Sequence, residues 1–167
     1  MNIYLLFGDK KKKSNDLKGG SKEIHHIDWL QCTSVSHAIN SPQPSGSAQR
    51  RDHADHSDFK IERSIDQASP KIVQHCSNGK TFSEVHIELT RMNKGDSPGL
   101  LMEYILKDVH ITFYEVLATD DLNSGSFTTE RFGLNFTEIN VIYTKIDDNG
   151  DPDGCIEATC DLKAHGH

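Results

Sequence analysis

Three neighbouring residues, Gly79, Lys80 and Thr81, match the end of a phosphate-binding loop. Such a loop follows a strand, contains an earlier glycine and opens a helix, so that its backbone amides converge on a phosphate group. Here the helix pattern precedes the turn, a strand pattern follows it, and position 74 is Gln74 rather than glycine. We therefore expect no nucleotide site at this turn.

An acidic run late in the sequence has part of the pattern of a calcium loop. Asn149, Asp151 and Asp153 alternate before Gly154, as oxygen ligands do around Ca²⁺. The twelfth position of the loop is Cys160, where a calcium loop needs a bidentate glutamate. A solvated acidic tail is the favoured interpretation, and a calcium site is the alternative that the sequence leaves open.

Cysteine and histidine side chains in the same region could supply zinc ligands. They are Cys155, Cys160, His165 and His167. Structural zinc sites typically use tighter cysteine pairs on an ordered scaffold, so we expect a frayed C-terminus and no metal site. With Cys32 and Cys76 the chain has four scattered cysteines, too few for a disulfide framework, and we expect reduced thiols.

A polar loop containing His53, Asp55 and His56 is the remaining candidate for acid–base chemistry. Nothing in the sequence around it buries or orients an imidazole as a general base requires. The adjacent His75 and Cys76 would point to different faces of a short helix, so Cys76 is a packed apolar residue rather than a nucleophile. We expect no catalytic site, no cofactor and no enzyme activity.

The strongest local pattern runs from Phe59 to Gly79 and predicts a strand, a short helix and a turn. Phe59, Ile61 and Ile65 alternate with polar residues, as in a strand with one buried face. Arg63 is the exception, because it occupies one of the inward positions. This unit is expected to organise the rest of the chain.

The helix of this unit is expected from Ser69 to Asn78. Ser69 offers an N-cap oxygen, and Pro70 suits the first helical position, where an amide would have no intrahelical partner. Gly79 can take the left-handed conformation that ends a helix. The residues expected on the docking face of the helix are Ile72, Val73 and Cys76.

Further strands are predicted in five runs: Asn2 to Phe7, Glu23 to Val35 with Trp29 in the core, Thr81 to Arg91, Leu100 to Leu117 and Phe132 to Tyr143. In the third run Val85, Ile87 and Leu89 should point inward and Glu84, His86 and Glu88 outward. In the last run the inward set changes parity between Phe136 and Ile139, which predicts a bulge near Glu138.

These elements predict a mainly β fold, a β-barrel or two-sheet sandwich with one short flanking helix. The 167 residues, 35% of them hydrophobic, suit one domain, which we place at residues 1–147. Residues 148–167 are expected to form an acidic, flexible tail. Only about twenty residues follow the last expected strand, fewer than the ~40 that an independent fold needs, so a fused catalytic domain is not expected.

The charge balance and the N-terminus limit the possible partners. Lys and Arg total 18 against 25 Asp and Glu, and the net charge of −7 argues against nucleic acid. The lysines at 10–13 follow the first apolar residues, the reverse of a signal peptide, and are expected in a solvated loop. No run approaches the ~18 apolar residues of a membrane-spanning helix, so we expect synthesis in the cytoplasm and no membrane insertion.

The order and spacing of these elements resemble the haemolysin-coregulated protein (Hcp) family, the inner-tube protein of type VI secretion. The resemblance extends over roughly Met1 to Lys145. The residues that carry it are Phe59, Asp66, Ser69, Pro70, Cys76, Gly79 and Lys80, together with Trp29 and Phe136 in the flanking strand runs.

The resemblance implies a structural protein that forms hexameric rings and stacks into the inner tube of a bacterial contractile machine. Family members are enclosed by a sheath, tipped by a spike protein, able to hold small effector proteins in the lumen, and secreted without a signal peptide. Two other classes stay open from the sequence, a monomeric β-barrel that binds a small ligand and a secreted effector. The molar mass would separate a monomer from a ring.

The run from Ile39 to Asp58 is almost free of apolar residues and is expected to form a long excursion. In the family that the chain resembles, the corresponding loop reaches onto the neighbouring subunit. Ordering such a loop costs about 1–2 kcal/mol per residue, which contacts outside its own subunit can offset. The interface candidates are Ser41, Gln49, Arg50, Arg51 and Asp52.

Overall fold

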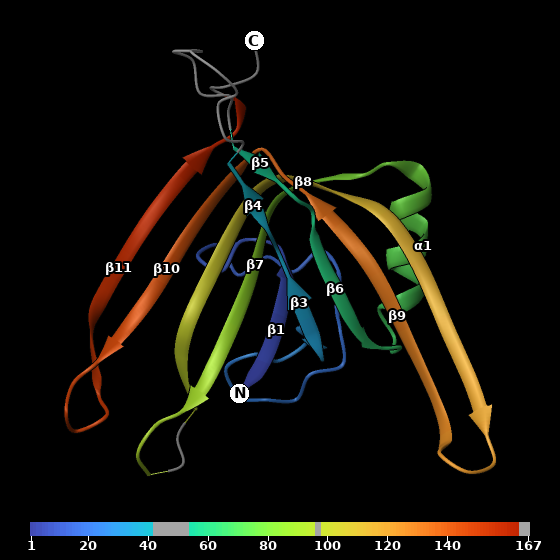
Figure 1. Ribbon diagram of the computed structural model, residues 1–167, viewed down its shortest axis with the longest axis horizontal. Helices are drawn as coiled ribbons and strands as arrows, with labels where there is room; N and C mark the ends of the chain where they lie inside the picture. The colour runs from blue at the N-terminus through green and yellow to red at the C-terminus, as the bar shows by residue number, and fades with distance from the viewer. Residues whose placement is uncertain (42–53, 96–97, 164–167) are drawn as a thin grey trace.

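Nine of the strands in the described residues form one large antiparallel sheet that curls around a single main core, and two short strands pair separately (Figure 1). The structure, a computed structural model, describes residues 1–41, 54–95 and 98–163. Their elements are β1 Asn2–Phe7, β2 Leu30–Cys32, β3 Ser34–Ser36, β4 Ile39–Asn40, β5 Asp55–His56, β6 Phe59–Ser64, α1 Ser69–Asn78, β7 Thr81–Met92, β8 Pro98–Asp121, β9 Gly125–Asn135, β10 Glu138–Ile146 and β11 Pro152–Asp161.

The sheet closes on itself through the segment at residues 30–36. Its strand order is β2-β1-β7-β8-β9-β6-β3, and the two end strands, β2 and β3, are separated in the chain by Thr33 alone. The Thr33 amide donates to the carbonyl of Glu62 at 2.9 Å, and its hydroxyl donates to the same oxygen at 3.0 Å. The predicted mainly β, barrel-like fold with one flanking helix is confirmed.

β8 is the longest strand and organises the two long hairpins visible in Figure 1. Its first half pairs with β7 and β10, and its second half pairs with β9. It turns at Asp108, which has a φ of 50° and accepts a 2.9 Å hydrogen bond from the hydroxyl of Thr137. Opposite this corner Phe136 and Thr137 separate β9 from β10, while Phe136 and Ile139 are both buried. The predicted change of parity is confirmed, but the predicted bulge near Glu138 is wrong, because this break between two strands produces the change.

The helix begins and ends where the sequence predicts, but its capping differs. Ser69 is not the N-cap, because its hydroxyl instead accepts the amide of Asp66 at 3.0 Å while Asp66 Oδ1 accepts the amide of Ala68 at 2.8 Å. Gly79 ends the helix with a φ of 68°, as expected. The predicted inward positions of Val73 and Ile65 are wrong, because both side chains are more than 40% exposed, at 42% and 47%.

Trp29 is buried, but not in the main core as predicted. It packs with Tyr4 and Leu6 in a second, smaller cluster on the opposite face of β1 from Ile3 and Leu5. The residues of the Trp29 region that enter the main core are Leu30 and Cys32. The remaining prediction for residues 23–28 is also wrong, since they form turns rather than a strand.

The last strand, β11, was not predicted from the sequence. β11 pairs with β10 over most of its length, with Ile139 opposite Cys160 and Val141 opposite Ala158. The expected division at residues 147 and 148 therefore falls inside the turn of the β10–β11 hairpin. There Asp147 Oδ1 accepts the amides of Asn149 at 2.9 Å and Asp151 at 3.0 Å, the hydrogen bonds of a tight turn. Of the cysteine and histidine group, Cys155 and Cys160 are exposed on β11, whereas His165 and His167 lie outside the described residues.

A buried ionic cluster centred on Arg63 connects the elements around the helix. The guanidinium is 2% exposed, with Nη1 2.5 Å from Glu130 Oε1, Nη2 2.5 Å from Asp66 Oδ2 and Nε 3.4 Å from the carbonyl of Gln31. Glu130 is fully buried, and its second oxygen accepts the hydroxyl of Tyr114 at 2.7 Å. Arg63 occupies an inward strand position because three oxygen atoms there satisfy its donors.

Replacing Arg63 with Ala should lower the free energy of unfolding by about 3–5 kcal/mol, because Glu130 would remain buried without its cation. Urea denaturation of the purified chain measures this loss. The matched control is Lys163→Ala, which breaks an exposed pair with Asp108 and should have a far smaller effect. Equal losses for the two variants would contradict this role of Arg63.

Candidate functional site

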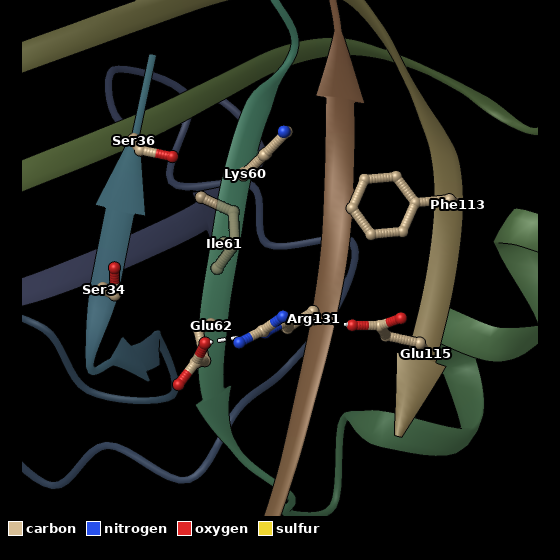
Figure 2. A pocket seen from close by; sticks show the side chains of 8 residues that line it. All are labelled: Ser34, Ser36, Lys60, Ile61, Glu62, Phe113, Glu115 and Arg131. Atoms are coloured by element: carbon tan, nitrogen blue, oxygen red, sulfur yellow. Dashed lines mark hydrogen bonds and ion pairs between the residues drawn. The ribbon is translucent and has the colours of Figure 1, made fainter. Parts of the chain in front are cut away.

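A groove of about 500 Å³ lies on the outer face of β3, β6, β9 and β8 (Figure 2). In Figure 2 the side chain of Arg131 extends between Glu62 on β6 and Glu115 on β8, and the ring of Phe113 lies above them on β8. The groove is lined by Ser34, Ser36, Lys60, Ile61, Glu62, Phe113, Glu115 and Arg131. This lining contains no histidine or cysteine, so it lacks the usual general base and nucleophile pair.

Three charged side chains of the groove, Glu62, Glu115 and Arg131, are paired with one another. Arg131 Nε donates to Glu62 Oε2 at 2.8 Å, and its Nη1 donates to Glu115 Oε1 at 3.4 Å. The hydrogen bond to Glu62 raises the pKa of Arg131 above its usual value. A guanidinium held between two carboxylates presents a flat polar surface, which suits contact with another macromolecule better than proton transfer.

Phe113 is positioned by a glycine on the next strand. The register pairs it with Gly133, and a Cβ atom at Gly133 would lie 2.6 Å from Cε1 of the Phe113 ring. The ring therefore lies directly over the backbone of β9, in space that any side chain at position 133 would occupy. This arrangement keeps a partly exposed aromatic ring fixed at the edge of the groove.

The apolar surface continues from the groove along the β8–β9 hairpin, which extends away from the barrel (Figure 1). The register pairs Glu115 with Arg131, Leu117 with Thr129 and Thr119 with Phe127, so these pairs share one face of the hairpin. Leu117 is 56% exposed and Phe127 is 47% exposed. We call this surface the hairpin face, and it comprises Phe113, Glu115, Leu117, Phe127 and Arg131.

Beneath the loop after β1, strand β7 carries a buried polar cluster whose residues the alternating pattern assigned to solvent. His86 and Glu88 on β7 were expected to point outward into water, but they are only 3% and 5% exposed. The loop after β1 covers them, and Lys10 from that loop binds both Glu88 and Glu103, the latter at 2.6 Å. Lys10 is thus not a purely solvated residue as predicted. Two sequence features could have indicated this cluster. They are the alternating acidic and histidine residues of β7 and the run of lysines at residues 10–13.

His26 is the second cation of this cluster. Its Nε2 lies 2.6 Å from Glu88 Oε2, its Nδ1 contacts Glu23, and its ring stacks on Tyr4 with the centroids 4.0 Å apart. Burial disfavours the imidazolium and would lower the pKa of His26, but the hydrogen bonds to Glu88 and Glu23 outweigh burial and raise this pKa. The cluster therefore holds the loop at residues 8–29 against the sheet through charge-assisted contacts.

A family model described as "Type VI secretion system effector, Hcp" matches residues 10–143 of this chain. The chain belongs to the Hcp family. Membership makes it a tube protein of type VI secretion, in a family of structural proteins secreted through that system. The resemblance stated from the sequence is confirmed.

Solved Hcp structures have the same fold. Hcp1 from Salmonella typhimurium is 19% identical, with a TM-score of 0.74, and the match covers 98% of this chain and 95% of that chain. A type VI secretion effector from Yersinia pestis is 23% identical, with a TM-score of 0.68 over 95% and 98% of the two chains. A structure titled a type six secretion system protein reaches a TM-score of 0.81 at 17% identity, over 98% and 97%. A search of curated protein sequences found no match.

The structure places the residues that carried the Hcp resemblance mainly at packing and turn positions. Phe59 and Phe136 lie in the main core, Cys76 packs against it, and Asp66 bridges Arg63 to the amide of Gly20 at 2.9 Å. Of the interface candidates, Ser41 is exposed beyond β4, whereas Gln49, Arg50, Arg51 and Asp52 lie outside the described residues. Their contact with a neighbouring Hcp subunit stays a prediction.

His56, a candidate from the polar loop of this Hcp chain, lies among ring side chains. Asp55 and His56 form β5, paired with β4, and His53 lies outside the described residues. The centroid of the His56 ring lies 5.3 Å from that of His37 and 6.1 Å from that of Phe136, which it meets edge-on, so its identified neighbours are rings.

No helix in the described ranges has the length and apolar character needed to cross a bilayer.

The raised pKa of His26 predicts that stability falls as the pH rises. A group with a higher pKa in the folded state stabilises the fold fully below its unfolded pKa, about 6.5 for histidine, and stops doing so above its folded pKa. The free energy of unfolding should therefore decrease as the pH rises above about 6.5, and His26→Gln should make this dependence shallower. Urea denaturation at a series of pH values measures both. An unchanged slope in His26→Gln, or an equally altered slope in the exposed neighbour His25→Gln, would refute this assignment.

Proposed function

We propose that this Hcp chain is the subunit of hexameric rings that stack into the inner tube of a type VI secretion system. In this proposal the tube lies within a contractile sheath, carries small effector proteins in its lumen and is expelled with the spike. The observation that carries the proposal is the hairpin face, whose apolar side chains lie on strands that extend away from the core. Exposed apolar surface of this kind marks a contact with another macromolecule.

The composition of the hairpin face suits a seam between subunits. Phe113, Leu117 and Phe127 supply apolar area, and Arg131 with its two carboxylates supplies a polar border. Interfaces commonly combine an apolar and aromatic centre with a polar rim in this way. A small-ligand barrel would instead place such side chains inside a cavity.

A free strand edge on the other side of the molecule offers a second surface for a ring. β11 pairs only with β10 among the described strands, and all of its residues are exposed. An exposed edge of this length normally needs a covering partner. Two different surfaces on opposite sides of one subunit permit head-to-tail contacts, the type of contact that generates a closed ring.

Replacing Leu117 with Ser tests the hairpin face. Its neighbour Val116 is equally exposed, at 56%, but points to the other face of the same hairpin, so Val116→Ser is the matched control. Loss of the Leu117 contact should cost about 1–2 kcal/mol at every seam, or roughly tenfold in each association constant. Leu117→Ser should therefore dissociate at protein concentrations where the parent and Val116→Ser remain assembled.

Sedimentation velocity and negative-stain microscopy provide the readout. A parent chain that is monomeric at micromolar concentration would overturn the ring and favour the ligand-binding alternative. If Leu117→Ser stays assembled and Val116→Ser dissociates, the proposal of a ring stands, but the contact between subunits lies on the opposite face of the hairpin.

A further inference from the structure

Three side chains with metal-binding atoms meet where the loop after β1 crosses β7. They are Asp9, Glu84 and His86, and one donor atom from each lies within 4.8 Å of the other two. Asp9 is the second residue after β1, and the amide of Gly8 between them donates to the carbonyl of Glu84 at 3.0 Å. The pairing of β1 with β7 thus fixes the two backbones that carry these side chains.

The imidazole of His86 is oriented for a ligand on Nε2. The residue is only 3% exposed, and its Nε2 lies 2.7 Å from Glu84 Oε1. Its Nδ1 is buried without a hydrogen-bond partner and faces Glu103 Oε2 at 3.6 Å. A proton on Nδ1 is attracted by the Glu103 carboxylate, and in that tautomer the lone pair of Nε2 points at Glu84. Two electron-rich atoms in contact need a cation between them, either a proton or a metal ion.

The two carboxylates are held so that each keeps one oxygen for a cation. Asp9 Oδ1 accepts the amide of Lys11 at 2.8 Å, and Oδ2 has no hydrogen bond within the described ranges. Glu84 Oε2 accepts the ammonium of Lys107 at 2.8 Å, which turns Oε1 toward His86. Second contacts of this kind orient ligands in established metal sites.

We infer that Asp9, Glu84 and His86 bind a first-row divalent transition cation, for which Zn²⁺ is the probe. One imidazole nitrogen and two carboxylate oxygens form a ligand set that such ions accept. Tetrahedral Zn²⁺ at about 2.1 Å from each ligand separates its ligands by about 3.4 Å, which small side-chain rotations reach from the present positions. The hollow beside the three residues, about 390 Å³, has room for water as the fourth ligand.

The bound cation would link the loop after β1 to β7. Asp9 belongs to the loop that covers the buried polar cluster, and Glu84 and His86 belong to the strand beneath it. Because an ion that binds only the folded state stabilises it, Zn²⁺ should raise the melting temperature of the full chain. The inference is independent of ring formation, since one subunit supplies all three ligands.

Equilibrium dialysis of the full chain against micromolar Zn²⁺, followed by metal analysis, should find one ion per chain. Asp9→Asn preserves the turn hydrogen bonds of the loop but removes the charged ligand, and should weaken Zn²⁺ binding at least about tenfold. Glu84→Gln should do the same. The control is Asp16→Asn, an exposed acid in the same loop, which should bind Zn²⁺ as the parent does.

Co²⁺ substitution distinguishes this site from the exposed cysteines of β11. The expected visible spectrum has d–d bands without thiolate charge transfer, and it should persist in the double variant Cys155→Ser, Cys160→Ser. Parent-like Zn²⁺ affinity in Asp9→Asn and Glu84→Gln, a stoichiometry well below one, or loss of binding in the cysteine variant would each overturn the inference.

Discussion

The guanidinium of Arg63 is the constraint on which the surrounding structure depends. A buried cation is tolerated only where enough oxygen atoms surround it, and Arg63 obtains them from Glu130, Asp66 and the carbonyl of Gln31. These partners lie on β9, before α1 and on β2, so the cation fixes their positions relative to β6. Apolar contacts alone would specify those positions less strictly, because they lack direction.

Two other faces of the sheet differ in whether the chain itself covers them. Over β7 a polar cluster is sealed by the loop after β1, with Lys10 and His26 between carboxylates. Along the β8–β9 hairpin, apolar side chains such as Leu117 and Phe127 lie exposed beside one paired arginine. In the ring that we propose, the hairpin face would contact a second copy of the chain. Its charges are already paired within one subunit, so such a contact would leave no charge without a partner.

The sequence predicted the elements whose signals are local. Alternation located β6, Pro70 and Gly79 bounded α1, and the change of parity after Phe136 located the break before β10. β11 was missed because its residues are exposed on both faces, so no periodic burial marks it. His86 and Glu88 were assigned to water because alternation shows which face a side chain takes, while a distant loop decides whether that face is covered. Arg63 was recognised only as an exception, since its partners Glu130 and Asp66 become neighbours only in the folded chain.

Closure through residues 30–36 has a consequence for how the barrel opens. The segment that ends one edge of the sheet at β2 begins the other edge at β3, so neither edge can fray alone. A shift of one residue in the register of this segment would turn Leu30 and Cys32 out of the core. The same shift would move Val35 away from its partner Ile61. Both pairings also join distant parts of the chain, which makes them slow to form. Closure should accordingly be a late, all-or-none step of folding, in which backbone amides of β2 and β3 gain protection from hydrogen exchange together.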